Sequence, residues 1–218
     1  VELYAKRHFR KGHQFAPPTE AYKEFTNDFP YQETPDQFKA IEAVLSDLEK
    51  DLPMDRIICG DVGYGKTEVA MRAAFRVLEE NKQVAVLCPT TILAQQHEKT
   101  FQERFKRFPY IIKSISRFKS NAESAQIMTE AREGKIDILI GTHKILSEDL
   151  HFKNLGLIIV DEEQRFGVSH KEKLKILREN IDVLTLTATP IPRTLHMGLI
   201  GIRAVSYTHL TLPTKRIV

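Results

Sequence analysis

Short apolar runs alternate with longer helix-like stretches along most of the chain. The runs are nearly continuous in apolar residues, as is typical of parallel strands that are buried on both faces. They lie at 57–59, 83–88, 110–115, 136–140, 157–160 and 183–186. The stretches between them predict helices at about 66–80, 91–106 and 122–133. This βαβ rhythm predicts an α/β fold with a doubly wound, mostly parallel sheet and helices on both faces.

A strong helix start precedes the first of these strands. Thr34-Pro35-Asp36-Gln37 combines an N-cap residue, a proline at the first helical position and the glutamine of a capping box. Apolar residues follow at helical spacing from Phe38 onward. We expect this helix to end at Leu52-Pro53, because the residue before a proline disfavours the helical conformation.

The first 28 residues are polar with scattered aromatic residues, and Pro17-Pro18 interrupts them. Residues 1–11 are typical of the end of a longer helix, which the two prolines would stop. We interpret residues 1–28 as a helical connector and residues 29–203 as the domain. The chain begins without a methionine or an apolar leader, so we expect a fragment with no signal peptide.

Composition narrows the class of protein only a little. The 218 residues suffice for one large domain, and 42% hydrophobic and 28% charged residues are ordinary for a soluble protein. No run of about 18 apolar residues is present, which argues against a membrane partner. The formal net charge of +3 neither demands nor excludes a nucleic acid. Two cysteines, Cys59 and Cys88, are expected to be buried in a reducing cytoplasm.

The most specific motif follows the first predicted strand. The eight residues Gly60-Asp61-Val62-Gly63-Tyr64-Gly65-Lys66-Thr67 match the G-x-x-x-x-G-K-[ST] pattern of phosphate-binding loops. The glycines let backbone N–H groups curl around an anion, and the following helix adds its positive end. Lys66 would reach the β- and γ-phosphates, and the Thr67 hydroxyl would bind Mg²⁺. We therefore expect ATP and Mg²⁺ as ligands rather than a chance glycine-rich turn.

A second motif completes the chemistry. The apolar run 157–160 leads directly into Asp161-Glu162-Glu163-Gln164. Asp161 is predicted to hold Mg²⁺ through water, and Glu162 to polarise the attacking water. Together with Lys66 and Gln164 these acids form the candidate catalytic set for phosphoryl transfer to water. A P-loop kinase and a simple acidic turn are the competing interpretations.

The order of the motifs resembles the first motor domain of superfamily 2 helicases, which implies a RecA-like P-loop NTPase domain. This resemblance implies that Gln37 reads adenine. It also implies a DNA strand-gripping role for Pro89, Thr90 and Thr91 and for Gly141, Thr142 and His143, and a role in coupling hydrolysis to domain movement for Thr187, Ala188 and Thr189. Hydroxyl and free N–H groups at the start of a loop or helix are good phosphate partners, which agrees with the first two triplets. Taken singly, each triplet would be an ordinary cap or turn.

Three stretches, 60–67, 161–168 and 187–197, strongly resemble the bacterial transcription-repair coupling factors, the Mfd family. The resemblance implies a cytoplasmic, ATP-dependent translocase on double-stranded DNA that displaces stalled RNA polymerase and recruits excision-repair proteins. RecG-like fork-remodelling helicases are the near alternative. They usually read Asp-Glu-Gln-His at residues 161–164 and carry a serine at the position of Tyr64.

The match to this family stops after Arg203. Val205 to Thr214 resembles a translated sequencing adapter, so we expect residues 204–218 to be a non-native tail that does not fold. A short, weakly alternating strand is the alternative. The family closes its ATP site with arginines from a second motor domain, worth about 10³–10⁵ in rate. We therefore expect the isolated chain to hydrolyse ATP very slowly, or to act as an ATP-switched binding module.

Overall fold

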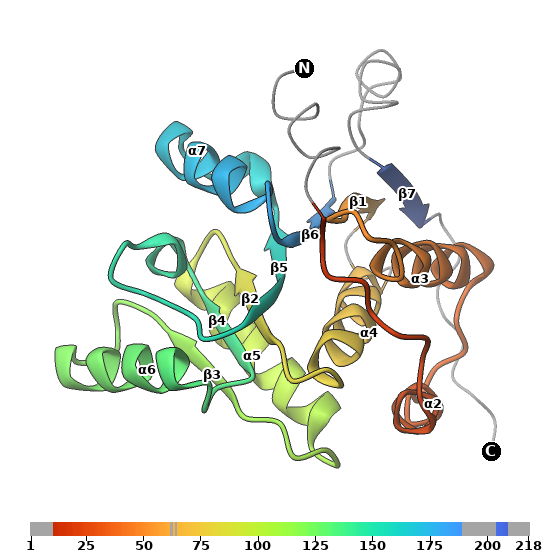
Figure 1. Cartoon of the computed structure of the whole chain (residues 1–218), viewed down its shortest axis with the longest axis horizontal. Helices are drawn as coiled ribbons and strands as arrows, with labels where there is room; N and C mark the ends of the chain where they lie inside the picture. The colour runs from red at the N-terminus through yellow and green to blue at the C-terminus, as the bar shows by residue number, and fades with distance from the viewer. Residues whose placement is uncertain (1–10, 62, 64, 189–203, 209–218) are drawn as a thin grey trace.

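Among the described residues, seven parallel strands form one sheet in the order β3-β4-β2-β5-β6-β1-β7 (Figure 1). The computed structural model describes residues 11–61, 63, 65–188 and 204–208. The strands are β1 (Asp55–Gly60), β2 (Gln83–Leu87), β3 (Ile112–Ile115), β4 (Ile138–Gly141), β5 (Leu155–Asp161), β6 (Asp182–Thr187) and β7 (Ala204–Thr208). All their pairings are parallel, which confirms the predicted fold class.

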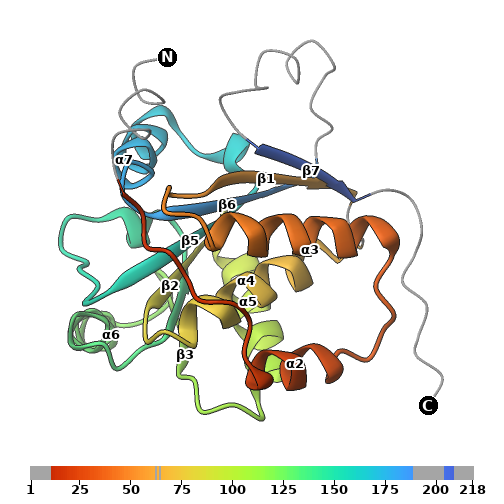
Figure 2. The same cartoon turned by 45° about the vertical axis from the view of Figure 1, so that its right-hand side comes forward.

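Helices cover both faces of this sheet (Figure 2). They are α2 (Glu20–Asn27), α3 (Pro35–Leu48), α4 (Lys66–Leu78), α5 (Thr91–Phe105), α6 (Asn121–Glu133) and α7 (Val168–Leu177), with the short 3₁₀ helices η1 (His143–Leu146) and η2 (Glu163–Arg165). The helices predicted at 66–80, 91–106 and 122–133 are confirmed as α4, α5 and α6. Within the described part of the chain, none of the helices has the length and apolar character needed to cross a membrane.

The strands are apolar throughout because each lies between two hydrophobic cores. Val84 on β2 belongs to the core that also holds Phe75 of α4, together with side chains of α2, α3 and α5. Its neighbour Ala85 points to the opposite core, with Ile127 of α6 and Leu174 of α7. Successive residues of a strand face opposite sides of the sheet, so both alternate sets must be apolar here.

Helix α3 begins as predicted and ends earlier than predicted. Thr34 and Gln37 form the capping box, with the Gln37 N–H donating to the Thr34 hydroxyl at 3.2 Å. The helix ends at Leu48 rather than at Leu52-Pro53. One reason is tertiary: the backbone N–H of Phe15 donates to the Leu48 carbonyl at 3.0 Å, so the N-terminal segment satisfies the end of the helix.

The described part of the predicted connector, residues 11–28, packs onto the domain. Phe15, Tyr22 and Phe25 are buried in the same core as α3 and α4. The ring of Phe25 stacks on Phe75 with 4.3 Å between centroids. This segment therefore shares the core of the domain, and the boundary placed at residue 28 stays a prediction.

Residues 204–208 form an edge strand, β7, beside β1. Arg56 of β1 pairs in register with Ala204, and its Nη1 donates to the Ser206 hydroxyl at 2.8 Å. This differs from the expectation that nothing folds after Arg203. The open edge of β1 presents unpaired N–H and C=O groups, which an extended segment of many sequences can complete. The origin of the tail stays a prediction, and residues 209–218 lie outside the described residues.

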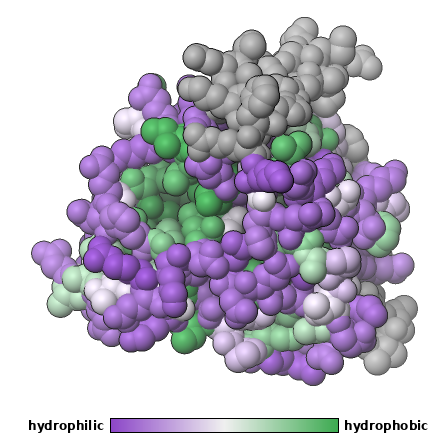
Figure 3. Space-filling model, in the orientation of Figure 1, coloured by the Kyte–Doolittle hydropathy of each residue, from purple (hydrophilic) through white to green (hydrophobic). Residues whose placement is uncertain are grey.

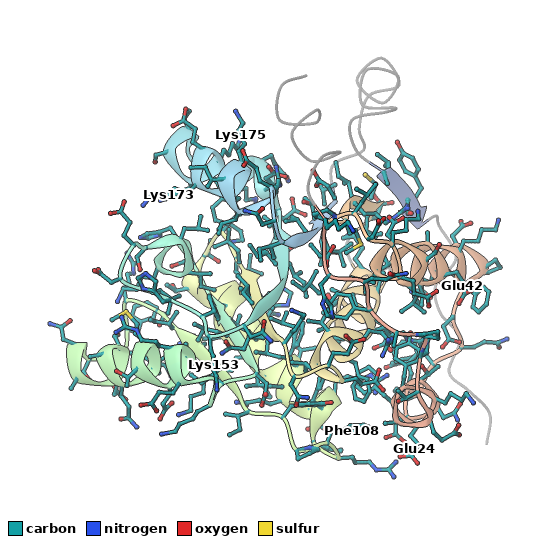
Figure 4. The ribbon with its side chains drawn as sticks, viewed as in Figure 1. Glu24, Glu42, Phe108, Lys153, Lys173 and Lys175 are labelled. Carbon is teal, nitrogen blue, oxygen red and sulfur yellow. The ribbon has the colours of Figure 1, made fainter. Side chains whose placement is uncertain are left out.

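A hydrophobic hollow, rimmed by hydrophilic residues, opens on the face that carries α7 (Figure 3). Ile145, Leu150 and Ile158 are among the residues that line this cavity of about 510 Å³. Figure 4 shows Lys173 extending from α7 over the adjoining loop, where its Nζ lies 3.4 Å from Glu148, whereas Lys175 projects outward.

Candidate functional site

The predicted site residues converge because the strands that carry them are parallel. Strand β6 lies between β1 and β5, and the register places Cys59 opposite Thr187 and Asp161 opposite Leu186. The three strands therefore end at the same level of the sheet. The loop after β1, the acids after β5 and the Thr187-Ala188 segment after β6 meet at the carboxyl edge, where open α/β sheets bind ligands.

The phosphate loop has the backbone geometry that its glycines allow. Gly63 and Gly65 have φ angles of +88° and +72°, in the left-handed region that favours glycine. Gly65 is the N-cap of α4, which starts at Lys66 and contains Thr67 in its first turn. The first N–H groups of a helix lack intrahelical partners, so α4 presents donors to an anion here. Val62 and Tyr64 lie outside the described residues.

Lys66 connects the loop to the acidic half of the site. Its Nζ donates to the backbone carbonyls of Gly60 and Asp61, the latter at 2.7 Å. Burial lowers the pKa of Lys66, while the carboxylates of Glu162 and Asp161 act in the opposite direction. The lysine therefore lies within electrostatic reach of both predicted catalytic acids.

Gln37 lies at the rim of the phosphate loop and is only 3% exposed. Its Oε1 accepts a hydrogen bond from the Thr34 N–H at 2.8 Å, which fixes the amide. Its Nε2 lies against Gly65, so closely that a Cβ at Gly65 would overlap it. The capping box thus holds the predicted adenine-reading residue against the loop that would bind the phosphates.

A cavity of about 1070 Å³ extends from Gly63 and Gly65 toward the segment before α3. Phe29 and Tyr31 line it and form an edge-to-face pair with 5.6 Å between ring centroids. Sequence reasoning did not single out this aromatic pair. The available signal was its position directly upstream of Thr34-Pro35. Aromatic faces beside a phosphate loop suit a planar base.

The acids after β5 occupy different environments. Asp161 accepts a hydrogen bond at Oδ2 from His97 Nε2 at 2.9 Å. Glu162 accepts at Oε1 from the Ala188 N–H at 2.8 Å, and at Oε2 from the side-chain amide of Gln164. Glu162 also has a φ of +51°, a left-handed conformation that is strained for this residue type. The predicted catalytic residues are therefore brought together, and His97 is an addition that the motifs did not reveal.

The residues predicted to hold Mg²⁺ fit that ion chemically. Thr67 and Asp161 supply hard oxygen ligands, which Mg²⁺ prefers. Mg²⁺ usually binds one or two protein oxygens together with substrate phosphates rather than a full protein cage. Among the described residues, no group of three or more His, Cys, Asp or Glu side chains that could hold a metal ion is found.

The two predicted strand-gripping triplets, Pro89-Thr90-Thr91 and Gly141-Thr142-His143, are neighbours because β2 pairs with β4 and Leu87 lies opposite Gly141. Thr90 caps α5, and its hydroxyl accepts from the Leu93 N–H at 3.2 Å. Thr142 is buried and precedes η1, whose first residue, His143, lies 5.3 Å from the ring of His170. Of the third triplet, Thr187 is buried at the end of β6, and Thr189 lies outside the described residues.

A parallel sheet with a phosphate loop after β1 and paired acids after β5 defines a P-loop NTPase domain of the helicase type. The sequence model of the DEAD/DEAH box helicase family matches residues 34–197. The chain belongs to the DEAD/DEAH box helicase family.

Two curated relatives carry the same description. The transcription-repair-coupling factor of Escherichia coli (strain K12) is 57% identical over 217 residues, which is 100% of this chain and 19% of that protein. The transcription-repair-coupling factor of Bacillus subtilis (strain 168) is 55% identical over 206 residues, which is 94% of this chain and 18% of that protein. The predicted resemblance is confirmed, and the chain spans about one fifth of these relatives. The expectation that the match stops after Arg203 was wrong, because the alignment with the Escherichia coli factor takes in 100% of the chain.

Solved structures agree with this placement. RecG bound to a three-way DNA junction matches with a TM-score of 0.82 and 32% identity, over 96% of this chain and 30% of that chain. The DEAD-box helicase Mss116, bound to ssRNA and UDP-BeF, matches with a TM-score of 0.67 and 18% identity, over 88% of this chain and 44% of that chain. The second likeness shows the fold alone. The identity to RecG is well below that to the coupling factors.

Proposed function

We propose that the chain is the ATP-binding first motor lobe of an ATP-dependent translocase on double-stranded DNA. The translocase displaces stalled RNA polymerase and couples it to excision repair. The observation that carries this proposal is that Glu162 links the phosphate loop to the segment after β6. Its carboxylate acts on the pKa of Lys66 of the phosphate loop and also accepts the Ala188 N–H of the coupling segment.

The residues divide the work as follows. Lys66 and the N–H groups of the loop hold the triphosphate, and the aromatic pair Phe29 and Tyr31 accepts the adenine. When bound, Mg²⁺ neutralises phosphate charge, and Thr67 and Asp161 are the residues that would hold it. Glu162 orients the attacking water, with its carboxylate fixed by Ala188 and Gln164.

The partners follow from the relatives rather than from this lobe alone. The backbone of double-stranded DNA would lie across the two triplets that begin at Pro89 and Gly141. RNA polymerase, excision-repair proteins and the second motor domain would bind or belong to other parts of the longer protein, in the bacterial cytoplasm. Because the second motor domain supplies the closing arginines, the isolated lobe is expected to bind nucleotide with little turnover.

The test uses the full-length protein that contains this domain. Lys66→Ala is expected to abolish binding of a fluorescent ATP analogue. Glu162→Gln is expected to preserve that binding and to lower ATP hydrolysis by about 10²–10⁴, the range of a general base. Both variants should lose translocation on double-stranded DNA. Glu172→Gln, on the exposed side of α7, is the matched control and should behave as wild type. Normal hydrolysis by Glu162→Gln would overturn the proposal.

A further inference from the structure

His97 contacts the predicted metal carboxylate from a helix that the helicase motifs assign to DNA. The Nε2 atom of His97 lies 2.9 Å from Asp161 Oδ2, and the two side chains are 13% and 15% exposed. An ionised carboxylate can only accept a hydrogen bond, so Nε2 carries the hydrogen and donates it. The contact therefore has a defined direction, from α5 to the end of β5.

Aromatic packing holds the ring of His97 in place. The ring meets Phe101, one turn further along α5, edge to face with 6.3 Å between centroids. Phe101 is 1% exposed and stacks on Phe105 with an interplanar angle of 5°. A ring fixed in this way loses little further freedom when it donates to Asp161, which makes it a suitable anchor for the carboxylate.

The hydrogen bond sets the plane of the Asp161 carboxylate. Because Oδ2 is engaged by His97, Oδ1 is the Asp161 oxygen that would remain available to an ion held together with Thr67. Carboxylates that bind metals are commonly oriented by such outer partners, and loss of a partner typically costs 10–100-fold in metal affinity or activity. A randomly oriented carboxylate would offer Mg²⁺ the correct oxygen only part of the time.

We propose that His97 is a positioning residue for the magnesium site, which orients Asp161 so that one oxygen faces the ion bound with the nucleotide. This role rests on the proposed function, because it requires that Asp161 and Thr67 take part in Mg²⁺–nucleotide binding. A purely structural role, in which the ring only fills space against Phe101, is the alternative that the experiment must separate.

Two substitutions separate these roles in the full-length protein. His97→Phe keeps a ring that can pack on Phe101 and removes the N–H. His97→Gln loses the ring and keeps a side-chain N–H that can reach Asp161. The measured quantity is the Mg²⁺ concentration at half-maximal binding of a fluorescent, non-hydrolysable ATP analogue, which does not depend on turnover. His151→Phe, at an exposed histidine outside the proposed site, controls for the general effect of replacing a histidine by phenylalanine.

We expect His97→Phe to raise the Mg²⁺ midpoint by about tenfold. Binding of the analogue in the presence of a chelator should stay unchanged. His97→Gln should stay near the wild-type midpoint, and His151→Phe should match wild type. A wild-type midpoint in His97→Phe, or an equal rise in both His97 variants, would overturn the positioning role. If His97→Phe does not fold, judged by its melting curve without ligand, His97→Met serves as the apolar variant.

The outcomes also separate this role from the proposed function. If wild type binds no nucleotide with Mg²⁺, or if Lys66→Ala binds as wild type does, the proposed function fails. If wild type shows Mg²⁺-dependent binding that Lys66→Ala abolishes, and His97→Phe has the wild-type midpoint, only the positioning role fails.

Discussion

The carboxylate of Glu162 accepts a hydrogen bond from the backbone N–H of Ala188 at 2.8 Å. The bond joins the end of β5 to the end of β6, two neighbouring strands of the sheet. A movement of the segment after β6 must therefore move the proposed catalytic carboxylate or break this bond. Through this contact, a displacement of the Thr187-Ala188 segment would change the position of the carboxylate that is proposed to act in hydrolysis.

Removal of this donor is the first prediction. Ala188→Pro eliminates the N–H and should lower ATP hydrolysis by the full-length protein by about 10², the lower end of a general-base contribution, while nucleotide binding remains. Ala188→Gly keeps the N–H and is the matched control. Steady-state hydrolysis and equilibrium binding are measured on both. Equal hydrolysis by the two variants would show that the hydrogen bond does not matter.

The left-handed backbone of Glu162 gives the second prediction. Its φ of +51° costs a non-glycine residue about 1–2 kcal/mol, and asparagine tolerates this region better than most residues. Glu162→Asn should therefore unfold at higher denaturant than Glu162→Gln, by about 1 kcal/mol in the free energy of unfolding. Both variants should hydrolyse ATP far more slowly than wild type. Equal stability would show that the position stores no backbone strain.

The phosphate loop gives a pair of matched glycine substitutions. A Cβ at Gly63 meets nothing within 4 Å, whereas a Cβ at Gly65 would overlap Gln37 Nε2. Both substitutions force an alanine into the left-handed region, at about 1–2 kcal/mol. Only Gly65→Ala adds the overlap, so it should weaken ATP-analogue binding more than Gly63→Ala. In a Gln37→Ala background the two effects should become similar, and a persistent difference would contradict this explanation.

A buried ionic network gives the fourth prediction. The carboxylate of Glu68 accepts from Arg72 Nε at 2.9 Å and from Arg104 Nε and Nη2 at 3.0 and 2.8 Å. Glu68→Gln would leave these buried guanidinium groups poorly compensated, which typically costs about 3–5 kcal/mol. Arg107→Met, at an exposed ion pair with Asp28, should cost about 1 kcal/mol or less. Urea unfolding measures both, and a comparable small loss would refute the prediction.

The lowered pKa of Lys66 predicts a pH effect. In the folded protein without ligand, Lys66 loses its proton at a lower pH than in the unfolded chain, where its pKa has the ordinary value of 10.5. Stability without ligand should therefore rise as pH increases through the lowered pKa, because the unfolded state binds more protons there. Bound phosphate favours the charged amine, so nucleotide affinity should fall over the same alkaline range. Lys66→Arg, which stays charged, should show no such fall in its own affinity.

The sequence alone predicted the parts of the fold that local patterns encode. The six apolar runs became β1 to β6, and Thr34 and Gln37 formed the capping box. Helix α7 was not predicted because its apolar residues lie on several sides: Leu174 is buried, whereas Val168 and Ile176 are 77% and 67% exposed. Such a segment has no clear amphipathic face to recognise.

The missed parts of the site depend on contacts between distant segments. The hydrogen bond between His97 and Asp161 joins residues that are 64 positions apart in the sequence, so no local motif predicts it. The aromatic pair Phe29 and Tyr31 lines the cavity at the phosphate loop, and the preceding helix α2 packs on α4 through Phe25 and Phe75. Motifs identify residues that act through their own chemistry, whereas residues that act through a neighbour become visible only in the folded chain.

Three contacts of the proposed site lie along helix α5. Thr90 caps it at the predicted DNA side, His97 bonds Asp161, and Arg104 bonds Glu68 just beyond the phosphate loop. Positions 97 and 104 lie seven residues apart, so they share one face of the helix. If DNA bound at Thr90 makes binding of the metal and nucleotide more favourable by some free energy, bound metal and nucleotide make DNA binding more favourable by the same free energy. The factor by which Mg²⁺–nucleotide tightens DNA binding would therefore equal the factor by which DNA tightens Mg²⁺–nucleotide binding.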